Sequence, residues 1–165
     1  MQMEIKYIIW IEGKQIKEYI NQEWETHQGV FDISFLSSIP NIYLAQGKDS
    51  VEVQNLLYTA FKSGKPFFIR YPRKSIKFNE IIKFSEIKLG KWKNEVNNDS
   101  RACVISYGDN VSKIKEYIKK NNLNLSLINA IFIKPINKTM LSSISKKYKY
   151  VFVVSDDVRQ GGLED

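Results

Sequence analysis

The sequence predicts an α/β fold made of two incomplete three-layer α/β units with mainly parallel sheets. Short runs of β-branched residues alternate along the chain with segments whose apolar residues recur at helical spacing. Such alternation favours parallel strands joined by crossover helices. A polar, lysine-rich stretch at 74–84 predicts the linker between a first unit at 1–73 and a second at 85–165, truncated at its C-terminus.

In the first unit, the clearest element is a helix that begins at Asp49. Asp49 is the predicted N-cap, and Glu52 completes a capping box. Apolar residues at i, i+3, i+4, i+7 and i+8 give this helix one buried face. The remaining predicted elements are strands at 5–11, 41–45 and 67–71, with one or two helical turns at 31–39.

The second unit repeats the alternation. Helices are predicted after the caps Asp109 and Asn137. No helix follows the last predicted strand, so we expect this chain to be part of a larger protein. The predicted strands lie at 102–106, 125–132 and 151–154, with a short strand at 89–92 and a turn at 94–100.

Composition narrows the class of protein. With 43% hydrophobic and 26% charged residues the chain is typical of a globular protein. No run of about 18 apolar residues indicates a membrane span, and no signal-peptide core opens the chain, so a cytoplasmic location is expected. The net charge of +7 comes from dispersed lysines, with only four arginines, which argues against nucleic-acid binding. Cys103 is the one cysteine, and its apolar neighbours predict a buried, inert thiol.

Two segments hold the residues best suited to chemistry. His27 is the one histidine and lies in a polar, glycine-containing segment, where an imidazole could donate to a substrate oxygen or relay a proton. Arg70 and Arg73 follow a predicted strand at the edge where open α/β sheets bind ligands. Arginine there suits a phosphate or carboxylate, although Arg70 could equally face a carboxylate within the fold.

No metal site is predicted. The Gly108-Asp109-Asn110 segment offers one carboxylate, whereas a diphosphate-bound magnesium needs several oxygen ligands. A helix cap explains Asp109 better. The sequence has no cluster of cysteine and histidine for zinc and no convincing Ser/His/Asp arrangement.

Several motifs in the same order resemble the 1-deoxy-D-xylulose-5-phosphate synthases, a family of transketolase-like thiamine-diphosphate enzymes. The resemblance covers about residues 25–165, and its most specific motif is Thr-His-Gln-Gly-x-Phe-Asp, since transketolases typically have Thr-His-Gln-Pro there. The motifs are Thr26-His27-Gln28-Gly29-Val30-Phe31-Asp32, Ile39-Pro40-Asn41, Leu57-Tyr58-Thr59-Ala60, Ile69-Arg70-Tyr71-Pro72-Arg73, Leu89-Gly90-Lys91-Trp92, Asn129-Ala130-Ile131-Phe132-Ile133-Lys134-Pro135 and Gly161-Gly162.

The resemblance implies a fold, a reaction and cofactors. Residues 1–73 would be the end of a pyrimidine-binding domain, and 85–165 most of a transketolase C-terminal domain. The family joins pyruvate to glyceraldehyde 3-phosphate with loss of carbon dioxide, a transferase reaction that supplies isoprenoid and thiamine synthesis. It uses thiamine diphosphate and Mg²⁺ and works as a homodimer.

The resemblance also implies roles for individual residues. His27 would be catalytic, pointing at the substrate near the thiazolium carbon. Arg73 would bind the phosphate of glyceraldehyde 3-phosphate, and Glu23 would stand in for a substrate-facing aspartate. Asp32 and Arg70 would support the loop and the strand that carry these groups.

The chain departs from the family pattern in several places. The family's Asp-Gly-x-Thr-His becomes Glu23-Trp24-Glu25-Thr26-His27, and the glycine usual after Arg73 is Lys74. Three features of the family have no counterpart in this chain. They are its Asp-Arg-Ala-Gly segment, its Gly-Asp-Gly motif for magnesium and diphosphate, and its cofactor-activating glutamate. We therefore expect that this chain alone neither holds the cofactor nor catalyses the reaction.

Two functions remain open from the sequence. The chain could be a fragment or subunit of a synthase that supplies His27 and Arg73 to a composite site, with a missing N-terminal domain or subunit as its partner. It could instead be a non-catalytic remnant or a domain for subunit contact. The degraded stretch 12–24 favours the second, and the intact histidine and arginine motifs favour the first.

Overall fold

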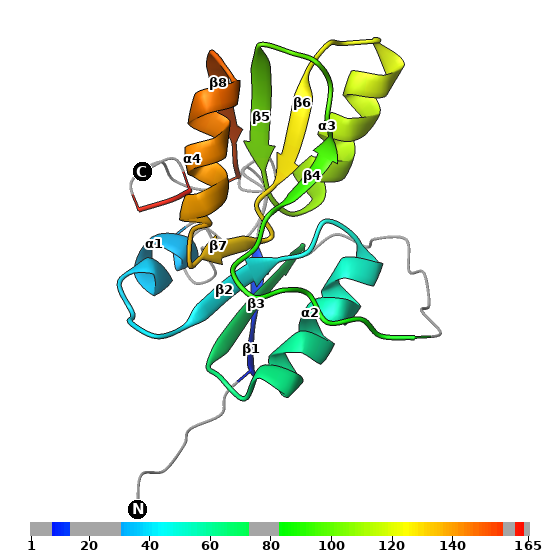
Figure 1. Cartoon of the computed structure of the whole chain (residues 1–165). Coiled ribbons are helices and arrows are strands. Elements are labelled where there is room, and N and C mark those ends of the chain that lie inside the picture. Colours follow the sequence, from blue (N-terminus) through cyan, green and yellow to red (C-terminus); the bar gives the residue numbers. More distant parts are fainter. Residues whose placement is uncertain (1–7, 14–30, 73–82, 157–160, 164–165) are drawn as a thin grey trace, which may run out of the picture.

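The computed structural model describes residues 8–13, 31–72, 83–156 and 161–163, and Figure 1 traces their path. No helix among these residues is long and apolar enough to cross a membrane. The first part of the chain forms β1 (Ile8–Gly13), α1 (Asp32–Ser37), β2 (Tyr43–Gln46), α2 (Ser50–Ser63) and β3 (Phe67–Pro72). The second part forms β4 (Lys93–Val96), β5 (Ala102–Ser106), α3 (Asp109–Lys120), β6 (Ser126–Asn129), β7 (Phe132–Lys134), α4 (Lys138–Lys147) and β8 (Tyr150–Val154).

The strands form two mixed sheets. In the first sheet, of order β1-β3-β2-β7, β3 lies parallel to both β1 and β2, and β7 runs antiparallel to β2. In the second, of order β4-β6-β5-β8, β5 lies parallel to both β6 and β8, and β4 runs antiparallel to β6. Within the described residues each sheet is thus parallel except for one edge strand, which confirms the predicted mainly parallel α/β fold.

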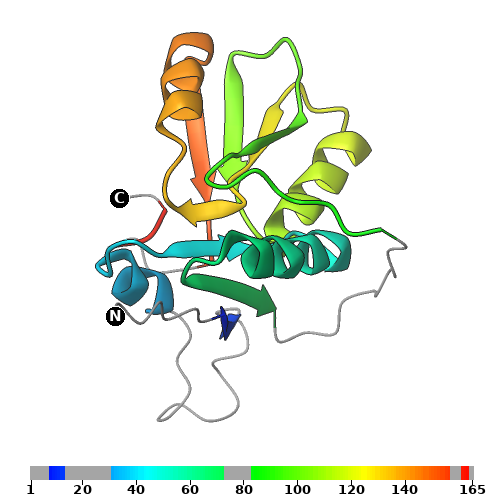
Figure 2. The same cartoon turned by 60° about the horizontal axis from the view of Figure 1, so that its bottom comes forward.

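Each sheet has helices on both faces. In the first, Leu56 of α2 packs with Ala45, whereas Ile33 of α1 packs with the adjacent Leu44. Neighbouring residues of a strand point to opposite faces, so the two helices cover opposite faces of this sheet. In the second sheet, Val104 packs against α3 and Cys103 against α4 by the same rule. Both units therefore have the predicted three layers (Figures 1 and 2).

The strand predicted at 125–132 is wrong in its extent, because the structure has two strands there. After β6 the Ala130 amide donates to the Ser106 carbonyl at 2.8 Å, and the Gln46 amide donates to the Ile131 carbonyl at 3.0 Å. The chain thereby leaves the second sheet and enters the first as β7. The stretch is mostly apolar without glycine or proline, so its sequence carries no mark of the break.

The short strand predicted at 89–92 is also wrong, since β4 lies just after it. Trp92 is instead buried beside the first sheet, where its indole nitrogen Nε1 donates to the Phe132 carbonyl at 2.7 Å. Because most residues of β4 are polar, the sequence predicted a turn at 94–100, which overlaps this strand. They form a strand because β6 offers them an open edge.

The helix caps agree with the sequence at two of three sites. The Asp49 carboxylate accepts from the Glu52 amide at 2.8 Å, and the Asn137 side chain accepts from the Met140 amide at 3.1 Å. Asp109 was predicted as an N-cap, but it is the first helical residue, and Gly108 precedes it as the cap.

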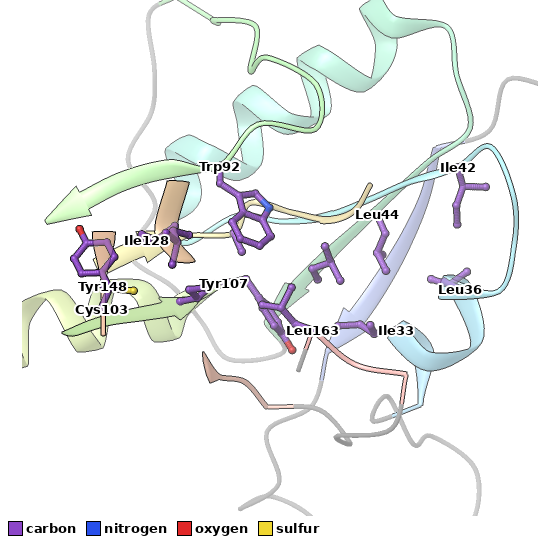
Figure 3. Packing of buried hydrophobic residues seen from close by; sticks show 14 residues of the cluster. Ile33, Leu36, Ile42, Leu44, Trp92, Cys103, Tyr107, Ile128, Tyr148 and Leu163 are labelled. Carbon is purple, nitrogen blue, oxygen red and sulfur yellow. The ribbon is translucent and has the colours of Figure 1, made fainter. Parts of the chain in front are cut away.

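One apolar cluster joins the two units. Ile33 and Leu44 of the first unit share it with Trp92 and Tyr107 of the second, as Figure 3 shows from close by. Leu163, near the end of the chain, belongs to the same cluster. The two units are therefore held together by a continuous buried core, which fixes the position of the strand ends between them.

Candidate functional site

The parallel strands of both sheets direct their carboxyl ends toward the contact between the units. Gln46 ends β2, Ser106 ends β5 and Asn129 ends β6, and all three are buried. Backbone hydrogen bonds link these ends, as described above for Ala130 and Ile131. This edge is where open α/β sheets place their ligands, so it is the candidate functional region.

Arg70 of β3 lies at the centre of this region and is 2% exposed. Its Nε donates to Asp32 Oδ2 at 2.7 Å, and its Nη2 donates to Asp32 Oδ1 at 3.2 Å. The planar guanidinium therefore binds both carboxylate oxygens of the first residue of α1. Of the two interpretations left open by the sequence, the geometry favours an arginine that faces a carboxylate within the fold.

The same guanidinium also reaches the second unit. Its Nη1 donates to Gln46 Oε1 at 2.6 Å, and its Cζ lies 5.9 Å from the centre of the Tyr107 ring. Gly108, next to Tyr107, has a φ of +61°, and a Cβ placed there would overlap the Gln46 side-chain amide. Only glycine fits this position without displacing Gln46, and Gln46 is in turn fixed by Arg70.

A second buried polar cluster crosses the same contact. Asn129 Nδ2 donates to both carboxylate oxygens of Glu52 at 3.1 Å. Lys48 binds Glu52 Oε1 at 3.0 Å and Glu95 Oε1 at 3.1 Å, and Lys115 binds Glu95 Oε2 at 3.2 Å. The Asn129–Glu52 and Lys48–Glu95 contacts thus connect the two units beside the strand ends, and Lys115 holds Glu95 within the second unit.

Burial and neighbouring charges shift the pKa values in this cluster in opposite directions. Burial alone would lower the pKa of Lys48, but the carboxylates of Glu52 and Glu95 outweigh it and hold that pKa above its ordinary value. Burial alone would raise the pKa of Glu95, but Lys48, with Lys115 and Lys93, holds that pKa below its ordinary value. Both groups are therefore charged at neutral pH.

Three of the predicted site residues lie outside the described residues: Glu23, His27 and Arg73. Described residues lie close in sequence to two of them, His27 and Arg73. Asp32 follows His27 by five residues and Arg70 precedes Arg73 by three, and these flanking residues form the ion pair given above. The roles predicted for Glu23, His27 and Arg73 stay predictions.

The described residues contain no group of three or more His, Cys, Asp or Glu side chains that could hold a metal ion. Asp109 binds Lys113 at 2.6 Å, and Asp32 and Glu52 are bound as described above. This part of the chain therefore does not fit a magnesium diphosphate. Cys103 is buried, and burial raises the pKa of its thiol, so the thiol is protonated and unreactive at neutral pH.

Sequence reasoning missed the residues that join the two units, namely Gln46, Tyr107, Gly108 and Asn129. A signal was present, because Gln46 and Asn129 are polar residues at the ends of apolar strands. Such residues are buried only where a partner satisfies them, and here the partners are Arg70 and Glu52.

The comparison with known proteins assigns the class. Residues 20–78 match the family described as transketolase, pyrimidine binding domain, and residues 90–165 match that described as transketolase, C-terminal domain. The chain therefore belongs to the transketolase-like proteins and carries segments of these two domains.

Curated relatives narrow the class further. The chain is 37% identical over 148 residues to the 1-deoxy-D-xylulose-5-phosphate synthase of Campylobacter jejuni and 36% identical over 147 residues to that of Clostridium beijerinckii. These matches cover 88% and 87% of the chain. The chain spans about a quarter of the relatives' length, 24% in each case.

Solved structures support the fold. One is described as a split gene transketolase, inactive beta4 tetramer, and it superposes with a TM-score of 0.75. The superposition covers 94% of this chain and 49% of that chain. The transketolase of Campylobacter jejuni superposes with a TM-score of 0.61, and the superposition covers 96% of this chain and 29% of that chain. Both are 16% identical, so they bear on the fold alone.

Proposed function

We propose that this chain is a component of a 1-deoxy-D-xylulose-5-phosphate synthase and contributes half of a composite active site. The observation that carries the proposal is the Arg70–Asp32 ion pair, seen in a chain 37% identical to such synthases over 88% of its length. This pair ties the segment that follows His27 to the strand that leads to Arg73. One chain could therefore present both side chains to the same substrate.

The proposed division of labour follows from side-chain chemistry. Arg73 binds the phosphate of glyceraldehyde 3-phosphate, because an arginine is always charged and donates two parallel hydrogen bonds. His27 donates to the carbonyl or hydroxyl oxygen of the substrate and can exchange that proton near neutral pH. Glu23 takes the place of the family's substrate-facing aspartate, with a side chain one methylene longer.

The cofactor belongs to the other part of the synthase in this proposal. Thiamine diphosphate supplies the carbanion chemistry of the family. The described residues offer no cluster of ligands for its magnesium ion. In this proposal a second polypeptide, or a further domain, holds the cofactor, and we expect no activity from this chain alone.

A second candidate is a non-catalytic domain for subunit contact. Trp24, in place of the family's glycine three residues before His27, favours it because an indole would crowd the substrate loop. In that case the fold would be kept for its apolar core, and the histidine and arginine would have no ligand.

Calorimetric titration of the purified chain with glyceraldehyde 3-phosphate distinguishes the two. Under the composite-site proposal we expect weak binding that is lost in Arg73→Ala and kept in Arg101→Ala, a matched loss of an exposed arginine. Absence of sugar-phosphate binding would favour the contact domain. Tight binding of thiamine diphosphate with Mg²⁺ would contradict the proposed division of labour.

A further inference from the structure

Helix α1 is too short to be stable by itself, so contacts with the rest of the fold determine its position. It has six residues, Asp32–Ser37, and isolated helices shorter than about 12 residues are marginal in water. Its N-cap residue is Phe31, whose side chain cannot cap a helix. The contacts at the two ends of α1 and along its side therefore decide where it lies.

The first unit holds the amino end of α1. Arg70 binds both carboxylate oxygens of Asp32 as described above, and Asp32 Oδ1 also accepts from the Ile33 amide at 2.9 Å. The carboxylate thereby lies at the positive end of the helix dipole. Asp32 comes five residues after His27, so α1 is the first described element after the predicted catalytic residue.

Lys134 of β7 holds the carboxyl end of α1. Its Nζ donates to the Ser37 carbonyl and to the Ile39 carbonyl, each at 2.6 Å. The last carbonyls of a helix have no partner within the helix, and a cation is favourable at that end. One ammonium group therefore binds the end of α1 and the turn that follows it, and it complements the helix dipole.

The insertion of β7 into the first sheet brings Lys134 to this helix. Lys134 pairs with Leu44 of β2, and directly paired residues of neighbouring strands point to the same face of a sheet. Leu44 packs with Ile33 of α1, so Lys134 points to the face that α1 covers. Figure 1 shows β7 next to α1. Lys134 belongs to the segment that matches the transketolase C-terminal domain, whereas α1 belongs to the segment that matches the pyrimidine binding domain.

A second contact from the same C-terminal segment lies along the side of α1. The Ser37 hydroxyl donates to the Gly161 carbonyl at 3.4 Å. A Cβ placed on Gly161 would lie 2.5 Å from Ser34 Oγ, so this backbone lies directly against α1. Leu163 joins Ile33 in the buried cluster. The C-terminal segment therefore contacts α1 along its side as well as at its carboxyl end.

We infer that Lys134 is a positioning residue of the proposed substrate site and acts through α1. It holds the carboxyl end of this helix while Arg70 holds the amino end, and together they set the place of the helix that follows His27 in the chain. The part of Lys134 is to position α1 rather than to bind the substrate. This role rests on the proposed function, because the substrate site itself belongs to that proposal.

Hydrogen exchange of the full chain, followed by mass spectrometry, tests whether Lys134 holds α1. Lys134→Met keeps an aliphatic side chain and removes the ammonium donors. We expect the amides of α1 to exchange at least about tenfold faster while those of α2 and α4 keep their rates, since local opening depends on local contacts. The matched control is Lys138→Met, at an exposed lysine of α4, and it should leave the rates of α1 unchanged.

Calorimetric binding of glyceraldehyde 3-phosphate tests the consequence for the site. We expect Lys134→Met to weaken binding by at least about tenfold. Lys134→Arg keeps the charge and the donors, so it should restore most of the affinity and the slow exchange of α1. If Lys134→Met does not fold, Lys134→Gln, which has a neutral amide donor, takes its place in both measurements. Faster exchange in all elements together would show a general loss of stability and would overturn the positioning role.

The two measurements distinguish the positioning role from the proposed function. If the unchanged chain binds the sugar phosphate and Lys134→Met binds it equally well, the positioning role is wrong and the proposed function stands. If the unchanged chain binds none, the proposed function is wrong, and hydrogen exchange alone decides whether Lys134 holds α1. Equal exchange of α1 in Lys134→Met and in the unchanged chain would overturn the positioning role in either case.

Discussion

The guanidinium of Arg70 and the carboxylate of Asp32 form a two-point ion pair at 2.7 and 3.2 Å that fixes α1 against β3. The side chains are 3% and 10% exposed, so the pair is shielded from water. A third nitrogen of the guanidinium binds Gln46 at 2.6 Å. Arg70 therefore positions a helix and a neighbouring strand at once.

Replacement of Arg70 should strongly destabilise the chain. Arg70→Ala leaves the Asp32 carboxylate buried without its partner, and we expect a loss of about 3–5 kcal/mol in the free energy of unfolding. Urea unfolding followed by circular dichroism measures it. The control Arg101→Ala, at an exposed arginine, should change the free energy by less than about 0.5 kcal/mol.

A double-mutant cycle isolates the pair itself. The double variant Arg70→Met/Asp32→Asn removes both charges. Its loss of unfolding free energy should therefore be smaller than the sum of the losses in the single variants Arg70→Met and Asp32→Asn. Additive effects would show that the ion pair contributes nothing beyond the packing of each side chain.

Gly108→Ala should weaken the contact between the units. The new methyl group would overlap the Gln46 amide, and the positive φ at this position disfavours alanine. We expect a loss of about 1–3 kcal/mol by urea unfolding. Gly90→Ala is the matched comparison, because Gly90 also has a positive φ (+66°) but meets only the edge of the Pro135 ring at 3.2 Å. An equal loss in both variants would contradict a role for the Gln46 contact.

Asn129→Asp should be more harmful than its small change in size suggests. Asn129 is fully buried and donates to both oxygens of Glu52, so an aspartate would place two carboxylates in contact. Thermal unfolding should show a marked loss of stability at pH 7 that shrinks on acidification, when one carboxylate takes up a proton. Asn121→Asp, at an exposed asparagine of the α3 C-terminus, should lack this pH dependence.

The Lys48–Glu95 pair should give the stability a defined pH window. The pKa of Glu95 is lowered from 4.5 in the folded chain, so its contribution is present above pH 4.5 and is lost as the pH falls through the folded value. The pKa of Lys48 is raised from 10.5, so its contribution is present below pH 10.5 and is lost as the pH rises through the folded value.

Glu95→Gln checks the acidic side of this window. The difference in unfolding free energy between the variant and the unchanged chain should be largest at neutral pH and should fall toward zero in acid. A difference that stays constant down to pH 3 would show that Glu95 does not titrate with folding.

Local signals predicted the fold well. The capping pattern of Asp49 and the apolar periodicity that follows it placed α2, and short β-branched runs placed most strands. What the sequence could not predict depends on contacts between distant residues. The break between β6 and β7 arises because β2 offers an open edge, and the burial of Arg70 depends on Asp32, which lies 38 residues earlier in the chain. No local window contains both members of such a pair.

The candidate site was predictable in part. The motifs around His27 and Arg73 pointed to the family, and the comparisons bear out that resemblance. The polar contacts between the units were not foreseen, because a polar residue at the end of an apolar strand, such as Gln46 or Asn129, indicates that a partner is needed but not which distant residue supplies it.

The insertion of β7 has a consequence for synthesis on the ribosome. The sheet that begins with β1 is finished only by Phe132–Lys134, so its last edge stays open while roughly sixty further residues are translated, about 3–12 s at ordinary elongation rates. The first sheet is therefore completed only after most of the second half of the chain has been translated. Cutting the gene between the two predicted units would separate β2 from its neighbour β7 and leave the first sheet without its last strand, whereas β4, β5, β6 and β8 of the second sheet would stay together in one product.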